Sequence, residues 1–143
     1  MFEENRLPQH ISINTFARFL FTSLFLLSGI THFTNVPYYL DLMPQVVPYK
    51  VTLIWVSGIV ELAGALMILF NWKARLGGWL LVLFLLPVTL VVHGYEMLYA
   101  ELEVVRALQQ AHFLKGFALI GAALLITQIG VSQQAVKSKV NKD

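Results

Sequence analysis

The most unusual chemical group in this sequence is the carboxyl of Glu61, which lies within an apolar stretch, residues 51–72, that has no other charged residue. An acid at such a depth costs about 2.5–3.5 kcal/mol to insert into a membrane and usually faces the protein interior. Ser57, Gly58 and Gly64 share its helical face, and small residues there allow a neighbouring helix to approach closely. Glu61 is therefore predicted to tie helices together, to transfer a proton or to bind a polar ligand group, and a lipid-facing position is the remaining alternative.

Arg18 is the second charged residue placed within an apolar stretch. If its long side chain bends back towards the nearer membrane surface, it is a snorkelling arginine. If it points inward it can pair with Glu61, because the expected depths of the two residues differ by only about 6 Å at 1.5 Å per helical residue. The sequence leaves both interpretations open.

Three histidines, His32, His93 and His112, fall at the predicted ends of three helices on one side of the membrane. Glu96 follows His93 by three residues and Lys115 follows His112 by three, so each pair shares a helix face. Lys115 either reaches the headgroups or turns inward beside Glu96. The histidines can bond loops and water, form a polar pocket for an organic ligand, or hold a metal as a three-histidine set does. Because their spacing is not diagnostic of a metal site, no metal is predicted.

Four long apolar stretches must position these residues. Apolar residues make up 57% of the 143 residues and charged residues only 13%, about half the usual share in a soluble domain. Spans are expected near residues 14–33, 51–70, 76–93 and 113–131, and each can cross a hydrocarbon core about 30 Å thick. These features exclude a soluble globular domain, a nucleic-acid binder and a disordered chain. They predict an all-α integral membrane four-helix bundle, with residues 1–143 as a single transmembrane domain.

The basic residues predict the orientation of the bundle. The side that holds both termini is expected to carry seven of them: Arg6, Arg18, Lys73, Arg75, Lys137, Lys139 and Lys142. The opposite side is expected to carry three: Lys50, Arg106 and Lys115. The positive-inside rule therefore places both termini in the cytoplasm. Glu3 and Glu4 stand where a signal peptide has basic residues, so the first span is expected to be a permanent helix.

The connections and packing faces give further expectations. The short connection at residues 71–75 makes the second and third spans antiparallel neighbours. The three prolines in residues 34–50 argue against a long helix there, so this connection is expected to form a flap at the membrane interface. Pro87 is expected to kink the third span. Ala118 and Ala122 are expected to form a packing face of the fourth span, and aromatic residues such as Phe25 and Trp79 to contact lipid. Because the chain has no cysteine, thiol relays and thiolate metal sites are excluded.

Four segments in this order resemble the DoxX family of four-helix bacterial membrane proteins, over about residues 14–130. They are Arg18 with Gly29-Ile30-Thr31-His32-Phe33, then Ser57-Gly58-Ile59-Val60-Glu61-Leu62-Ala63-Gly64, then His93-Gly94-Tyr95-Glu96, and finally Phe113-Leu114-Lys115-Gly116. The family often has Asn after this lysine, and Gly116 departs from that pattern. The resemblance implies a multi-pass protein of the bacterial cytoplasmic (inner) membrane. Some relatives are linked to quinone-coupled sulfur oxidation and others to redox or oxidative-stress partners, while most have no established activity.

Two classes of function follow, and a small transporter is a third, less favoured class because no matched pair of broken helices is present. The first is a redox-associated accessory subunit that binds a quinone in a polar pocket beside an oxidoreductase partner. Its ligand-binding or proton-transfer residues would come from Glu61, Arg18, His32, His93, Glu96, His112 and Lys115. The second is a non-catalytic membrane anchor or a module for a small apolar ligand, in which the buried polar residues serve packing. Whether the chain is an enzyme and whether it forms a homo-oligomer are left open.

Overall fold

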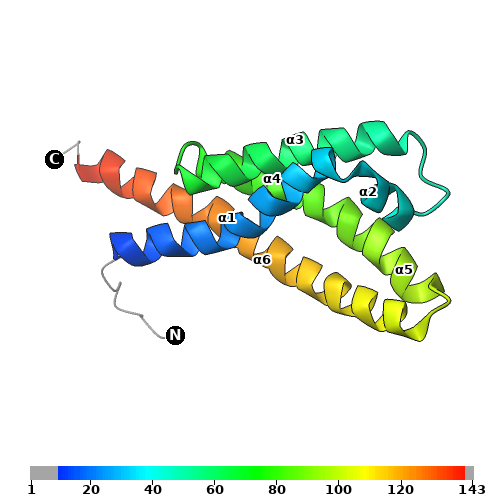
Figure 1. Ribbon diagram of the computed structural model, residues 1–143. Coiled ribbons are helices and arrows are strands. Elements are labelled where there is room, and N and C mark those ends of the chain that lie inside the picture. Colours follow the sequence, from blue (N-terminus) through cyan, green and yellow to red (C-terminus); the bar gives the residue numbers. More distant parts are fainter. Residues whose placement is uncertain (1–9, 141–143) are drawn as a thin grey trace.

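The protein, seen here in a computed structural model, is described over residues 10–140, with side chains up to Gln128, and this part of the chain contains helices and no strand (Figure 1). The elements are α1 (Ile11–Thr34), α2 (Val36–Leu42), α3 (Lys50–Leu69), α4 (Ala74–Pro87), the π-helix η1 (Val88–His93), α5 (Gly94–Tyr99) and α6 (Glu103–Val140). The side chains of Arg6, Lys137, Lys139 and Lys142, used in the topology prediction, lie outside the described residues. The prediction of cytoplasmic termini therefore stays a prediction.

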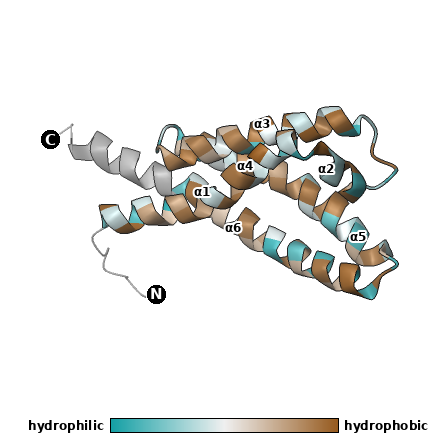
Figure 2. Ribbon diagram, in the orientation of Figure 1, coloured by the Kyte–Doolittle hydropathy of each residue, from teal (hydrophilic) through white to brown (hydrophobic). Residues whose placement is uncertain are grey.

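Within the part of the chain that the structure describes, four helical stretches are long and apolar enough to cross a membrane: Ile11–Thr34, Lys50–Leu69, Ala74–Tyr99 and Glu103–Gln128. The predicted all-α membrane fold is thus confirmed, and hydrophobic residues cover most of these helices in Figure 2. The fourth stretch begins ten residues before the expected boundary at residue 113. Residues 103–111 contain neither proline nor glycine, so nothing in them interrupts a helix and α6 continues through this polar segment.

The helices α3 and α4 are antiparallel neighbours, as the short connection predicted, and their backbones meet at two glycines. A Cβ atom added to Gly77 would lie 2.7 Å from the carbonyl oxygen of Gly64, and one added to Gly64 would lie 3.0 Å from that of Gly77. Only glycine at both positions permits this separation without movement of a helix.

The register between α1 and α3 is set by a second pair of glycines. A Cβ atom on Gly29 would lie 2.7 Å from Leu62 Cγ, and one on Gly58 would lie 2.7 Å from His32 Cβ. Because His32 near the end of α1 lies against Gly58, the first two turns of α3 project beyond α1. The short helix α2 packs against both α1 and α3 at this end of the bundle, which is on the right of Figure 1. The predicted flap is therefore a helix that folds back over the end of α1.

The third span changes its helix type immediately after Pro87, where the π-helix η1 begins. Proline has no N–H to donate to the preceding turn, so the regular hydrogen-bond ladder cannot continue through it. Within η1 the Thr89 side chain packs against α6, and a Cβ atom on Gly116 would lie within 3.0 Å of three Thr89 side-chain atoms. Any side chain at position 116 would collide with Thr89, which gives a physical reason for a glycine there.

The core differs from the expected packing faces in two places. Phe25, expected to contact lipid, is only 1% exposed and belongs to a core with Ile68, Leu81 and Ala123, whereas Trp79 is exposed as expected. Ala118 is exposed, so the face proposed for Ala118 and Ala122 is wrong. The buried face of α6 is formed instead by Gln109, Gly116, Ile120, Ala123 and Thr127. Hydropathy does not distinguish these faces because the lipid-facing side is as apolar as the core.

Thr89 yields the first prediction. Its Oγ1 is the single fully buried side-chain nitrogen or oxygen without a hydrogen-bond partner in the part of the chain whose side chains are described. Thr89→Val keeps the branched shape and removes the unpaired hydroxyl, so it should raise the free energy of unfolding by about 1 kcal/mol. Denaturant titration in detergent micelles measures the change, and a loss of stability would show that the hydroxyl has a partner.

Candidate functional site

Glu61 lies at the centre of a polar cluster between α1 and α3. Its Oε2 lies 3.3 Å from Nδ1 of His32 and 3.3 Å from Oγ of Ser28. The side chains of His32 and Glu61 are 5% and 1% exposed, so the pair is enclosed by the helices. Two polar side chains of α1 thus converge on the acid of α3 within the membrane-spanning part of the chain.

The hydrogen bonds fix the roles of the two imidazole nitrogens of His32. Nδ1 lies 2.9 Å from the carbonyl oxygen of Ser28, and a carbonyl can only accept, so Nδ1 carries a proton that it shares with the Glu61 carboxyl. In the neutral ring Nε2 then holds a free lone pair. No hydrogen bond to Nε2 is formed within residues 10–128.

Tyr39 of α2 covers this pair. Its ring stacks on His32 with centroids 4.0 Å apart and an interplanar angle of 25°. The Tyr39 hydroxyl lies 2.6 Å from Thr31 Oγ1 and donates to the Ser28 carbonyl at 3.4 Å. The Phe84 ring of α4 meets His32 edge-on at 5.9 Å. His32 is therefore held between two aromatic rings, one of which belongs to a seven-residue helix.

The ion pair considered between Arg18 and Glu61 is not formed, since His32–Glu61 is the only ion-pair contact in the described side chains. Arg18 precedes His32 by fourteen residues, which is about 21 Å along a helix axis. The sequence-based estimate assumed that the spans begin and end at equal depths. Because α3 projects beyond α1, the middle of α3 lies beside the end of α1, and Glu61 meets His32 instead.

A second polar cluster, the His93 cluster, joins η1 to α6. His93 Nδ1 lies 2.7 Å from Gln109 Oε1, and its ring stacks near His112, with centroids 5.2 Å apart and an interplanar angle of 19°. Nζ of Lys115 lies 3.1 Å from Nδ1 of His112. Lys115 thus bonds a histidine and does not turn towards Glu96, whose side chain forms no hydrogen bond or ion pair in the described part of the chain.

The three histidines do not form one site. His32 belongs to the Glu61 cluster, whereas His93 and His112 belong to the His93 cluster. No group of three or more His, Cys, Asp or Glu residues that could hold a metal occurs within the described residues. The alternative of a three-histidine metal centre therefore receives no support from this geometry.

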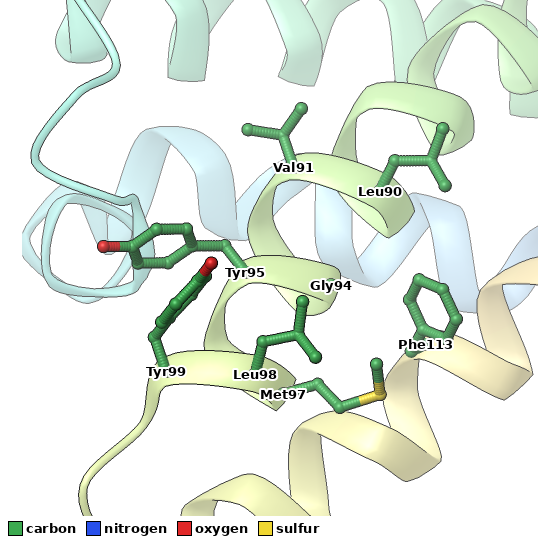
Figure 3. Close-up of a pocket in the computed structure, with 8 residues that line it drawn as sticks. All are labelled: Leu90, Val91, Gly94, Tyr95, Met97, Leu98, Tyr99 and Phe113. Carbon is green, nitrogen blue, oxygen red and sulfur yellow. The ribbon is translucent and has the colours of Figure 1, made fainter.

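An apolar pocket of about 400 Å³ opens between η1, α5 and α6 near the His93 cluster (Figure 3). It is lined by Leu90, Val91, Gly94, Tyr95, Met97, Leu98, Tyr99 and Phe113. None of the residues predicted from the sequence as ligand-binding or proton-transfer groups lines it.

Sequence reasoning missed three residues that contact the predicted ones: Ser28 and Gln109, which form hydrogen bonds, and Tyr39, which stacks on His32. Ser28 precedes His32 by four residues, so the helical period could have placed it on the same face. Tyr39 lies in residues 34–50, of which the sequence predicted only an interfacial flap. Its contact with His32 depends on the fold of α2, which has no local signal beyond Pro37 in its first turn.

Comparison with known proteins identifies one family. The family model described as DoxX matches residues 13–94, more than half of the chain. This range includes Ser28, His32, Tyr39 and Glu61, and it ends before His112 and Lys115. Neither a curated protein nor a solved structure matches the chain.

Proposed function

The chain belongs to the DoxX family, and from this premise we propose that it is a redox-associated accessory protein which binds a quinol or quinone ring at the Glu61 cluster. The chain is a polytopic membrane protein with several apolar helices. We further propose that it lies in a bacterial cytoplasmic membrane as one transmembrane domain and serves a membrane-associated oxidoreductase. The observation that carries the proposal is a phenol ring already stacked on His32.

Tyr39 supplies the argument for the shape of the ligand. A phenol ring and a quinol ring are both flat and aromatic and both have a hydroxyl on the edge. The Tyr39 ring stacks on His32 at 4.0 Å, and its hydroxyl bonds Thr31 and Ser28. A quinol that displaced Tyr39 would meet the same aromatic and hydrogen-bonding surroundings of His32. The short helix α2 would then move aside as the ligand enters.

The chemistry follows from the arrangement of His32 and Glu61. The lone pair on Nε2 accepts a hydrogen bond, and then a proton, from a hydroxyl placed beside the ring. The Glu61 carboxyl next to Nδ1 stabilises the imidazolium that forms and keeps the ring in the required tautomer, as the acid of a catalytic triad does. Oxidation of a bound quinol to the quinone would release two protons and two electrons: Nε2 of His32 would take one proton, the second would leave to water, and both electrons would pass to the redox centre of the partner.

Binding of a decyl-tailed ubiquinol by the purified protein in lipid nanodiscs tests the proposal. The matched control ligand is the same molecule with both hydroxyls methylated, which retains its shape and tail but cannot donate a hydrogen bond. We expect the quinol to bind about tenfold more tightly than its dimethyl ether, because a lost hydrogen bond to a buried acceptor costs about 1–1.5 kcal/mol. Equal affinities would contradict a site that recognises hydroxyl groups.

Tyr39→Leu yields the second prediction. The substitution removes the ring that occupies the stacking surface of His32, so the quinol no longer competes with it. We expect the affinity for the quinol to rise about three- to tenfold, the range for the removal of a modest competing contact. Tyr38→Leu is the matched control, because Tyr38 lies next to Tyr39 but is exposed and does not stack on His32. A weaker affinity of Tyr39→Leu would show instead that Tyr39 itself binds the ligand.

A second function, a non-catalytic membrane anchor or a module for a small apolar ligand, is favoured by the contacts that Glu61 makes with two residues of α1. In that case the cluster joins two helices and has no ligand. A partner that co-purifies and keeps its activity after Glu61→Gln would support this function over the first.

A further inference from the structure

The apolar pocket between η1, α5 and α6 plays no part in the proposed function, and none of its lining residues belongs to the Glu61 cluster. It follows the last turns of the spanning stretch Ala74–Tyr99. Leu98 and Tyr99 in its lining are 65% and 67% exposed, so the pocket is open to the surroundings of the helices. An empty pocket would forfeit the dispersion contacts of its walls, so an apolar occupant is favoured.

Contacts within the protein hold both sides of this pocket in place. A Cβ atom on Gly94 would lie 3.3 Å from Cε2 of Phe113, so the missing side chain lets the Phe113 ring stand against α5. The Phe117 ring packs on Phe113, with centroids 5.0 Å apart. Tyr95 and Tyr99 stand on the other side in Figure 3, and their ring centroids are 4.8 Å apart. The space between the two sides is therefore formed without help from an occupant.

The order of the lining residues along the chain matches the depth profile of a membrane lipid. Leu90 precedes Tyr99 by nine residues, which is roughly 13 Å along a helix. Tyrosines are favoured at the membrane–water interface, where the ring meets hydrocarbon and the hydroxyl meets water. The pocket therefore extends from the headgroup level at Tyr99 towards the hydrocarbon core at Leu90, as an acyl chain does.

The connection that follows Tyr99 carries more acid than base. Glu101 and Glu103 are both exposed, and Arg106 is the single basic residue in residues 100–111 of the sequence. Its Nη2 donates to a backbone carbonyl of the connection at 3.2 Å. Two acids and one base complement a headgroup that has both a phosphate and an ammonium group. A headgroup with only negative charge would meet an excess of acid.

We propose that this pocket is a lipid site, which holds one acyl chain of a zwitterionic phospholipid with a primary ammonium headgroup. Its volume of about 400 Å³ has room for on the order of ten methylene groups, if each takes about the 30 Å³ share of a water molecule in the liquid. A protein partner fits poorly, because a stable protein interface buries about 1,000 Å² or more. The tail of a quinol is also apolar, so the headgroup distinguishes these two sources of a chain.

The position of the chain is tested with a phosphatidylethanolamine that carries a diazirine near the end of one acyl chain. A small amount of this probe is added to phosphatidylglycerol nanodiscs that hold the whole protein. Labelled residues are identified by mass spectrometry after illumination. We expect the label to concentrate on residues 90–99 and Phe113. Leu98→Trp and Val91→Trp should each lower this labelling about fivefold or more, because a filled pocket opposes entry of the chain as overpacking does.

Leu102→Trp is the matched control for these substitutions. Leu102 is 66% exposed, close to the value for Leu98, and it is not among the residues that line the pocket. Labelling of residues 90–99 should be unchanged in this variant. The proposal would be overturned if labelling survived both filling substitutions. It would also be overturned by labelling spread evenly over exposed apolar residues such as Leu27.

The headgroup is tested with a phosphatidylglycerol that carries the same diazirine chain. We expect it to label the pocket about three- to fivefold less than the phosphatidylethanolamine probe, the range for exposed charge pairs. Glu101→Gln combined with Glu103→Gln should remove the difference. Equal labelling of the wild type by the two probes would overturn the proposal, and so would displacement of the phosphatidylethanolamine probe by decyl-tailed ubiquinol. Glu61→Gln should leave the labelling unchanged, so this result stands apart from that of the proposed function.

Discussion

Glu61→Gln should weaken binding of the quinol about ten- to a hundredfold while the protein stays folded. The amide oxygen of glutamine can still accept from Ser28 Oγ and from Nδ1 of His32, so the helix contacts are retained. The amide cannot take a negative charge and cannot accept a proton, so it stabilises neither the imidazolium nor a strong hydrogen bond at Nε2. A hydrogen bond assisted by a charged group contributes about 1.5–3 kcal/mol, which corresponds to the expected loss.

Glu96→Gln is the matched control. It makes the same chemical change at a half-buried acid whose side chain forms no hydrogen bond or ion pair in the described part of the chain. Its quinol affinity should equal that of the wild type. The free energy of unfolding should change by less than about 1 kcal/mol in both variants, because no buried partner is left unpaired.

The same pair of measurements separates the two proposed functions. If Glu61→Gln binds quinol as tightly as the wild type, the Glu61 cluster is a packing contact and the anchor function is favoured. If affinity falls together with a large loss of stability, the change cannot be assigned to the ligand site. In that case His32→Gln supplies the decisive comparison, because it removes Nε2 as an acceptor beside an unchanged Glu61.

Gly77→Val should lower the free energy of unfolding by about 3 kcal/mol or more. A Cβ atom at this position lies 2.7 Å from the backbone oxygen of Gly64 and 2.9 Å from Cβ of Met67. Neither atom is the end of a flexible side chain, so α3 and α4 must separate, and overpacking of this kind typically costs about 1–3 kcal/mol even where side chains can adjust. Unfolding of the micelle-bound protein, followed by circular dichroism against added dodecyl sulfate, measures the loss.

Gly121→Val is the matched control for this change, because a Cβ atom on Gly121 meets no atom within 4 Å. It should change the free energy of unfolding by less than about 0.5 kcal/mol. Similar losses in both variants would mean that valine disturbs helices of this protein irrespective of contact, and the Gly64–Gly77 contact would then contribute little.

The sequence by itself determined which segments are long and apolar enough to cross a membrane, and which residues could carry chemistry. Span length and apolar composition are local properties, and the hydrocarbon core imposes them on each helix separately. A short connection is likewise a local property, so residues 71–75 were sufficient to predict that α3 and α4 are antiparallel neighbours. Glu61 was identified because a polar group at membrane depth is costly wherever its neighbours are, and His32 because it is one of three histidines at the predicted helix ends on one side of the membrane.

Only the tertiary structure decided which of these residues meet. The partner of Glu61 is His32 and not Arg18, because the contacts of Gly29 with Leu62 and of Gly58 with His32 set the register of α1 against α3. That register depends on packing between surfaces distant in sequence, and hydropathy contains no information about it. The division of the three histidines between two clusters, and the Tyr39 ring over His32, have the same cause: apolar helices pack by shape, and shape is fixed only when all of the helices are in place.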